Sequence, residues 1–110
     1  MAVGPAPVAV MVFDDPAVVA AALRDVAVEY LSLAPGPFAA RLTSVDLGAM
    51  RFQDALDDAH IGRGAVAPDR MLMLFAPEEL PPRTLLNGHA MASAEAMVLG
   101  PSTEFFARVR

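Results

Sequence analysis

Turn-forming residues interrupt the chain at intervals of about ten residues, and this spacing is the strongest constraint on its fold. Apolar residues in most of the intervening segments recur at every second position, which is the period of a β-strand. The turn-forming segments are Pro35–Pro37, Gly48, Asp57–Asp58, Pro68–Asp69, Asn87–Gly88 and Gly100–Pro101. The pattern predicts a mainly β domain, a barrel or a sandwich, of about seven to nine short strands.

One short helix is predicted near the N-terminus, over residues 15–24. The run Asp14-Asp15-Pro16 supplies a carboxylate for the helix N-cap and a proline for the first helical position. The expected buried face consists of Val18, Val19, Ala22 and Leu23. Residues 1–12 are expected to form an extended arm, part of which adds a strand to a sheet, and residues 13–110 form the domain.

Three later segments give more specific predictions. Residues 70–75 are continuously apolar after Arg70, which favours a strand that is buried on both faces. Asn87-Gly88 is the strongest short hairpin signal, because both residues tolerate the positive φ of a type I′ turn. Phe38, Ala40 and Leu42 alternate with other residues and are expected to share one face of a strand.

The charge balance argues against nucleic-acid binding by this segment. The eight basic residues are all arginines, the acidic residues number 13, and the net charge is −5. Affinity for nucleic acid depends on clustered Lys and Arg, and here the arginines are scattered. No apolar run reaches the roughly 20 residues of a membrane helix, and residues 1–12 lack the positive charge of a secretory signal. We expect a cytoplasmic protein without a membrane partner.

Hydrophobic residues make up 55% of the 110 residues, and there is no cysteine. A chain of this size leaves much of its surface exposed, so part of the apolar excess is expected to meet a second copy or a neighbouring domain. The alternative is a core enriched in alanine and methionine. The lack of cysteine excludes disulfides, zinc–thiolate sites and thiol nucleophiles.

Neither a catalytic site nor a metal site is predicted. The two histidines, His60 and His89, fall in different hairpins, and neither has a carboxylate at metal-ligand spacing. We expect His89 at the surface and His60 in a solvated loop after Asp57-Asp58. Adjacent acids in extended structure point to opposite faces, so they form no acid–base pair. The serines lack the Gly-x-Ser-x-Gly frame. We therefore expect no enzyme activity and no cofactor.

Ligand binding inside the sheet is the remaining possibility, because alternate side chains face the lumen when a sheet closes into a barrel. The candidate lumen residues are Arg41, Met50, Arg51, Phe52, Met71, Met73 and Phe75. Methionine makes adaptable contacts with apolar ligands, and an inward arginine holds a carboxylate in a bidentate fork. The alternative is that these methionines and phenylalanines are ordinary core residues.

Two runs, Val12-Phe13-Asp14-Asp15-Pro16 and Tyr30 through Gly48, resemble the N-terminal cupin-like domain of AraC-type transcriptional regulators. The later order is also similar: Pro68-Asp69-Arg70 precedes an apolar strand, Asn87-Gly88 precedes a returning strand, and Leu99 through Phe105 follows. The resemblance covers nearly the whole chain and rests on turn and pattern motifs.

The resemblance implies a cupin-like (jelly-roll) β-barrel that senses a small-molecule effector, forms a homodimer and controls a helix-turn-helix domain. The family's effector contacts follow no fixed motif, so no ligand residue is transferred. This segment contains no helix-turn-helix, so DNA would be reached only through a separate domain. The alternative is a stand-alone cupin-like protein, either a small-molecule-binding assembly module or a small enzyme.

Overall fold

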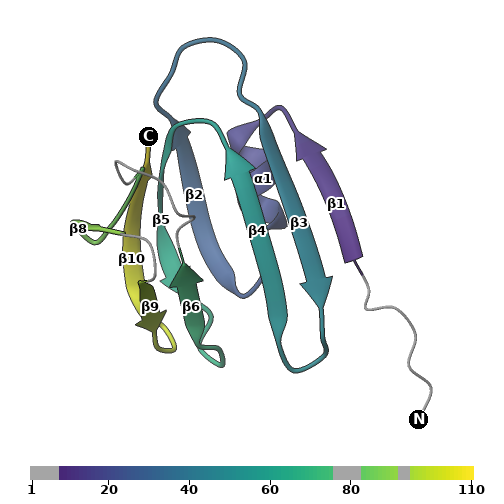
Figure 1. Cartoon of the computed structure of the whole chain (residues 1–110), viewed down its shortest axis with the longest axis vertical. Coiled ribbons are helices and arrows are strands. Elements are labelled where there is room, and N and C mark those ends of the chain that lie inside the picture. The colour runs from purple at the N-terminus through teal and green to yellow at the C-terminus, as the bar shows by residue number, and fades with distance from the viewer. Residues whose placement is uncertain (1–7, 76–82, 92–94) are drawn as a thin grey trace.

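The computed structural model describes residues 8–75, 83–91 and 95–110, which fold into antiparallel sheets with one helix (Figure 1). The prediction of a mainly β structure with one helix near the N-terminus is confirmed. The described residues form ten strands, more than the seven to nine predicted. The difference arises because residues 8–12 of the expected arm belong to a complete strand, and because very short segments pair as separate strands.

The strands belong to three sheets. The first sheet has the order β1-β3-β4 and consists of β1 (Val8–Phe13), β3 (Ala40–Asp46) and β4 (Arg51–Asp57). The second has the order β2-β5-β10-β7-β8 and consists of β2 (Val26–Ser32), β5 (His60–Val66), β10 (Glu104–Val109), β7 (Thr84–Leu86) and β8 (His89–Ala90). The third pairs β6 (Leu72–Phe75) with β9 (Ala96–Leu99).

The single helix, α1 (Pro16–Ala22), begins as the sequence predicts and is slightly shorter. Asp15 is the N-cap, and its Oδ1 accepts a hydrogen bond of 2.8 Å from the backbone N–H of Ala17. Pro16 occupies the first turn, where its missing N–H costs nothing. The buried face differs from the expectation: Val19 and Ala20 are buried, whereas Val18 is half exposed. The helix packs chiefly against β2, and this contact selects the face.

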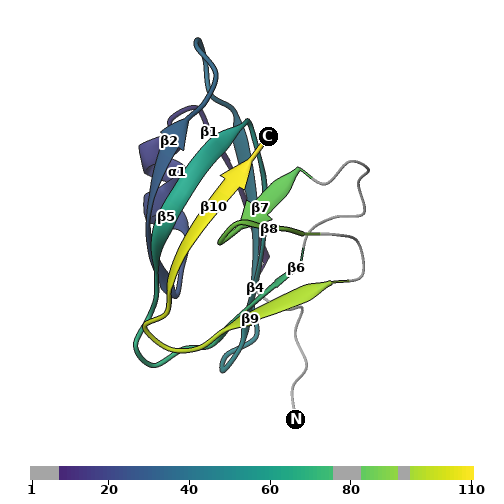
Figure 2. The same cartoon turned by 90° about the vertical axis from the view of Figure 1, so that its left-hand side faces the viewer.

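The core lies beneath α1, between the helix and the first two sheets. Val19, Phe38 and Ala40 form a buried cluster, and Phe13 and Tyr30 pack against it. The predicted common face of Phe38, Ala40 and Leu42 is confirmed, since all three are buried. Figure 2 shows α1 on one side of β2, β5 and β10, with the β7–β8 hairpin and the β6–β9 pair on the other side.

Side chains of β4 join the first sheet to the turn that leads into β2. Gln53 accepts a hydrogen bond of 2.8 Å from the backbone N–H of Arg24 and donates one of 3.0 Å to the Arg24 carbonyl. Arg51 forms an ion pair of 2.8 Å with Asp25 and a longer one of 3.4 Å with Asp46. Arg70 also lies 3.3 Å from Asp25. These contacts join β4, the edge strand of the first sheet, to the turn before β2 of the second sheet.

Two glycines, one in a hairpin turn and one in a strand, occupy positions that disfavour a larger residue. Asn87 and Gly88 have φ values of 49° and 82° and connect β7 to β8, so the predicted hairpin is confirmed. Asn87 also accepts a 2.8 Å hydrogen bond from the backbone N–H of Phe106, which ties the hairpin turn to β10. In β5, a Cβ built on Gly64 would stand 1.9 Å from the Ala27 carbonyl oxygen, so this position has no room for a side chain.

The prediction that residues 70–75 form a strand buried on both faces is wrong. In β6 the residues alternate between half-buried and exposed, with Met73 and Phe75 each more than half exposed. The reason is topological, because β6 pairs only with β9 and no second layer covers its outer face among the described residues. None of the described helices has the length and apolarity needed to cross a membrane.

Candidate functional site

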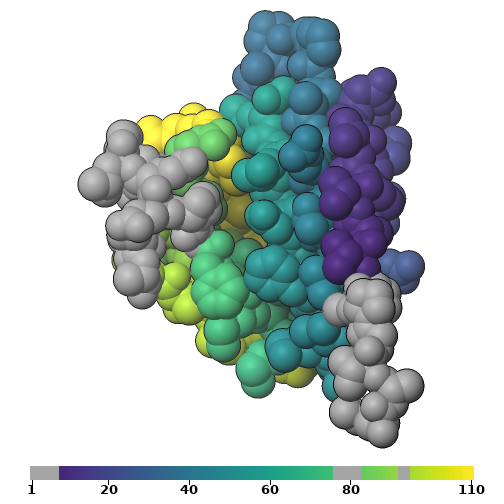
Figure 3. Space-filling model, turned by 45° about the vertical axis from the view of Figure 1, so that its right-hand side comes forward, coloured from purple at the N-terminus to yellow at the C-terminus, as the bar shows by residue number. Residues whose placement is uncertain are grey.

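An open cavity of about 760 Å³ lies between the first and second sheets and continues around the free edge of β4. Strands β2, β4, β5, β6, β7 and β10 all contribute to its wall. In Figure 3 the surface is hollowed between the teal strands of the first sheet and the green and yellow C-terminal segments. The cavity has an inner part between the sheets and an outer part that opens toward β6.

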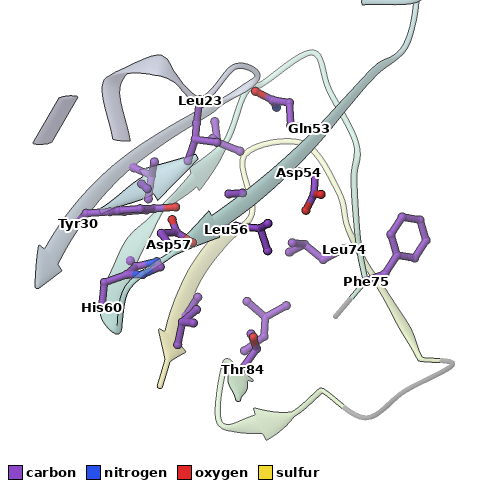
Figure 4. A pocket seen from close by; sticks show the side chains of 18 of the residues that line it. Leu23, Tyr30, Gln53, Asp54, Leu56, Asp57, His60, Leu74, Phe75 and Thr84 are labelled. Carbon is purple, nitrogen blue, oxygen red and sulfur yellow. The ribbon is translucent and has the colours of Figure 1, made fainter. Parts of the chain in front are cut away.

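The two parts carry different side chains (Figure 4). Tyr30, Asp57 and His60 lie in the inner part, on one side of β4, whereas Asp54, Leu56, Leu74 and Phe75 lie on the other side. This division follows from the strand period, because successive residues of β4 point to opposite faces of the first sheet. The apolar wall is otherwise formed by residues such as Leu23, Val28 and Leu86.

Tyr30, Asp57 and His60 form a compact polar cluster at the inner end of the cavity. The rings of Tyr30 and His60 are stacked, with centroids 4.1 Å apart and an interplanar angle of 22°. Phe38 meets His60 edge-on at 6.3 Å. The Tyr30 hydroxyl points toward the Asp57 carboxyl (Figure 4). Asp57 and His60 are three residues apart at the turn from β4 to β5, and the pairing of β2 with β5 brings Tyr30 to them.

The expectation that His60 is a solvated loop residue is wrong, because its side chain is buried at 3% exposure. His60 is the first residue of β5, and the inward positions of this strand recur at His60, Gly62 and Val66. Gly62 provides the space for the cluster: a Cβ there would stand 3.2 Å from the Tyr30 ring. The strand period indicates this position in the sequence, because it places His60 on the same face of β5 as Gly62, two residues later.

The hydrogen bond of His60 defines its tautomer. Nδ1 lies 2.9 Å from the Asp58 backbone carbonyl oxygen. A carbonyl oxygen only accepts, so Nδ1 carries the proton and Nε2 of the neutral ring is an acceptor. None of the hydrogen bonds between described residues involves Nε2.

Asp57 occupies an environment that disfavours its charge. Burial raises the pKa of Asp57, and this effect outweighs the opposing influence of His60, the Tyr30 hydroxyl and Arg83. Within the described part of the chain, its Oδ2 is buried without a hydrogen-bond partner. Burial also raises the pKa of Tyr30, and the Asp57 carboxylate adds to this effect. A buried carboxylate with an unpaired oxygen is complementary to a hydrogen-bond donor.

The candidate lumen residues fall into three groups. Arg51, the best buried of them, lines the cavity but is paired with Asp25 and Asp46. Four others line the cavity and have exposed side chains: Arg41, Phe52, Met73 and Phe75. Met50 and Met71 are exposed at 65% and 69% and do not line it. Sequence reasoning did not select Tyr30, Asp57 and His60, which form the inner polar cluster.

Metal-ligating groups do not converge anywhere in the described residues, where no cluster of three or more His, Asp or Glu side chains has a geometry suited to a metal ion. His89 is exposed, as expected, and its Nε2 lies 2.7 Å from Glu95. No protein-family model, curated protein or solved structure matches this chain.

Proposed function

We propose that this chain is an effector-binding domain whose ligand occupies the cavity between the first two sheets. The observation that carries the proposal is an apolar cavity of about 760 Å³ with a small polar cluster at its inner end. Binding sites for small molecules combine these features, since apolar walls supply affinity and a few polar groups fix the orientation of the ligand. The volume is in the range of such sites.

The polar contacts of the ligand are assigned to the inner cluster and not to Arg51. Arg51 is the arginine that points inward, with a side-chain exposure of 20%, but Asp25 and Asp46 neutralise it. Releasing it to bind a carboxylate would break both ion pairs and loosen the junction between the sheets. Its role in the proposal is to position β4, whereas Tyr30, Asp57 and His60 contact the ligand.

The proposed role in the cell is that of a sensor domain in a cytoplasmic bacterial transcription regulator. Its support is the resemblance of the sequence to AraC-type sensor domains, together with antiparallel sheets that surround a cavity. In this proposal the fold is a cupin-like (jelly-roll) barrel that is open beside β4. DNA is bound by a separate helix-turn-helix domain, and ligand binding in the cavity of this segment controls that domain.

Homodimerisation is the second part of the proposed role. Its support is the outer face of the first sheet, where Val10, Val12 and Leu56 are each more than half exposed. Val12 and Leu56 flank the exposed Arg41 across the paired strands β1, β3 and β4, and β1 is an edge strand. Exposed apolar residues beside a free edge are suited to pairing with a second copy.

Sedimentation velocity tests the dimer. The unaltered chain should sediment as a dimer, and Val12→Glu should shift it toward monomer. Leu31→Glu, on β2, is the matched control because Leu31 is also well exposed but lies on the second sheet. A monomer at all concentrations, or equal effects of the two substitutions, would exclude this interface.

A small enzyme is the alternative function, and the Tyr30–Asp57–His60 cluster is the observation that favours it. A carboxylate with a raised pKa is suited to general acid–base chemistry near neutral pH. The sensor proposal differs in that the ligand leaves unchanged. Incubation of each bound compound with the protein, followed by mass and chiral analysis, separates the two functions, since any conversion that Asp57→Asn abolishes supports the enzyme.

Ligand-observed NMR with a collection of small apolar molecules tests the cavity itself. Ala55 is half-buried and lines the cavity. The larger side chain of Ala55→Leu should fill part of the cavity and weaken binding. Ala21→Leu, at an exposed position on α1, is the size-matched control and should bind as the unaltered chain does. Equal binding by both variants would place the ligand elsewhere and reject the proposal.

A further inference from the structure

The inner cluster presents more hydrogen-bond acceptors than donors to the cavity. Nδ1 of His60 carries a proton that is directed at the Asp58 carbonyl, so in the neutral form of the ring Nε2 is an acceptor. The Asp57 carboxylate is also an acceptor, and its Oδ2 has no hydrogen-bond partner among the described residues. The Tyr30 hydroxyl is the nearby donor, and it supplies a single proton. A ligand that completes this cluster must bring donors of its own.

The charge around the cluster indicates which donor fits. The charged or titratable groups that act on Asp57 are Tyr30, His60, Asp58 and Arg83. Arg83 also lines the cavity, and its Nε donates to the Arg110 carbonyl. Asp54 adds a second carboxylate along the outer part of the cavity, and the chain as a whole carries −5. Four arginines and three aspartates line the cavity as a whole, so the attraction for a cation is local to the Asp57 carboxylate, whose Oδ2 has no partner among the described residues.

The faces of the cluster are aromatic and its surroundings are apolar. Tyr30 lies over Gly62 and stacks on His60, while Val28 and Leu86 line the same cavity from β2 and β7. Aromatic faces are favourable neighbours for a cationic nitrogen, and apolar walls favour a hydrocarbon group attached to it. A primary ammonium has three donors, enough to reach both acceptors at once.

We propose that the inner end of the cavity binds a protonated amine carried on a small apolar group, with Asp57 and His60 accepting its hydrogen bonds. This inference rests on the proposed function, because it specifies the ligand class of the same cavity. Tyr30 holds His60 in place and covers the apolar part of the ligand. The competing ligand class is a carboxylate, which Arg83 or Arg41 would receive at the cavity wall.

Three compounds of matched shape separate these classes. The probes are 2-phenylethylamine, 2-phenylethanol and phenylacetate, titrated calorimetrically into the full chain at neutral pH. The amine should bind most tightly, by roughly tenfold over the alcohol, and phenylacetate should bind least. In Asp57→Asn the amine should lose this preference while the alcohol keeps its affinity, because the cavity is unchanged in size. Asp54→Asn is the control for general charge and should leave most of the preference in place.

The outcomes distinguish failure of the proposed ligand class from failure of the proposed binding cavity. Tighter binding of phenylacetate or of the alcohol would overturn the amine inference and leave the effector-binding function standing. An amine preference that survives in Asp57→Asn would also overturn it. Failure of all three probes to bind would count against both. Asp57→Asn is suited to the test because removal of a buried charge should not unfold the chain, and circular dichroism is the measurement that checks its folding.

Discussion

The phenol ring of Tyr30 is stacked on the imidazole of His60, with the ring centroids 4.1 Å apart. The two residues are diagonal neighbours on adjacent strands, since Tyr30 pairs with Gly62 and Ser32 pairs with His60. The glycine opposite Tyr30 leaves the space that its ring fills. Tyr30 is also the single tyrosine of a chain without tryptophan, so its spectroscopic signals report directly on the inner end of the cavity.

The two glycines of β5 should respond differently to alanine. Gly64→Ala places a Cβ against the backbone of Ala27 and should cost about 3 kcal/mol of unfolding free energy. The Cβ of Gly62→Ala is close to the edge of the Tyr30 ring and in ordinary contact with Val28, so the substitution should cost about 1 kcal/mol and shift the ring. Urea unfolding measures both, and the near-ultraviolet signal of Tyr30 should change in Gly62→Ala. Equal stability of Gly64→Ala and the unaltered chain would refute the close strand approach.

Asp57→Asn should stabilise the chain at neutral pH. The folded state raises the pKa of Asp57 because burial disfavours its charge. Stability from this group is therefore fully present below the ordinary aspartate pKa, about 3.9, and is lost as pH rises through the folded pKa. Asp57→Asn has no carboxyl group to ionise. The difference between its urea midpoint and that of the unaltered chain should therefore grow as pH rises from about 3.9 through the folded pKa of Asp57. A difference that is constant with pH, or that shrinks as pH rises, would contradict the burial of the charge.

Arg51→Met should lower the urea midpoint clearly more than Arg63→Met. Arg51 is 20% exposed and holds Asp25 and Asp46, and its loss leaves a partly buried Asp25 with Arg70 as its remaining ion-pair partner. Arg63 forms one ion pair of 3.4 Å with Glu29, and both side chains are largely exposed. Exposed pairs contribute little to stability. Similar midpoints for the two variants would show that the junction between β4 and the α1–β2 turn is not stabilised by Arg51.

Asp15→Ala should cost about 1 kcal/mol of unfolding free energy, because it removes the side-chain acceptor that caps α1. Asp14→Ala is the matched control: Asp14 is the adjacent acid and is not the cap, so its replacement should change stability by less than half as much. Thermal unfolding at neutral pH measures both. A larger effect at Asp14 would mean that the helix begins one residue earlier than in this structure.

The sequence determined the features that depend on neighbouring residues. The cap at Asp15, the turn at Asn87-Gly88 and the shared face of Phe38, Ala40 and Leu42 follow from local conformational preferences and strand period, and all are present. The class of fold followed from the spacing of the turns. Such features are predictable because their physical causes lie within a few residues of each other.

The tertiary structure decided what each strand faces. Period alone separates the two faces of a strand without saying which is covered, so Met73 and Phe75 of β6 are exposed while His60 is buried. Asp57 and His60 are close in sequence, but Tyr30 joined them only through the pairing of β2 with β5, a contact distant in sequence. The pairing of Arg51 with Asp25 arises in the same way. The sequence by itself determined a β domain with one capped helix, and only the packing of its sheets determined which polar side chains meet inside it.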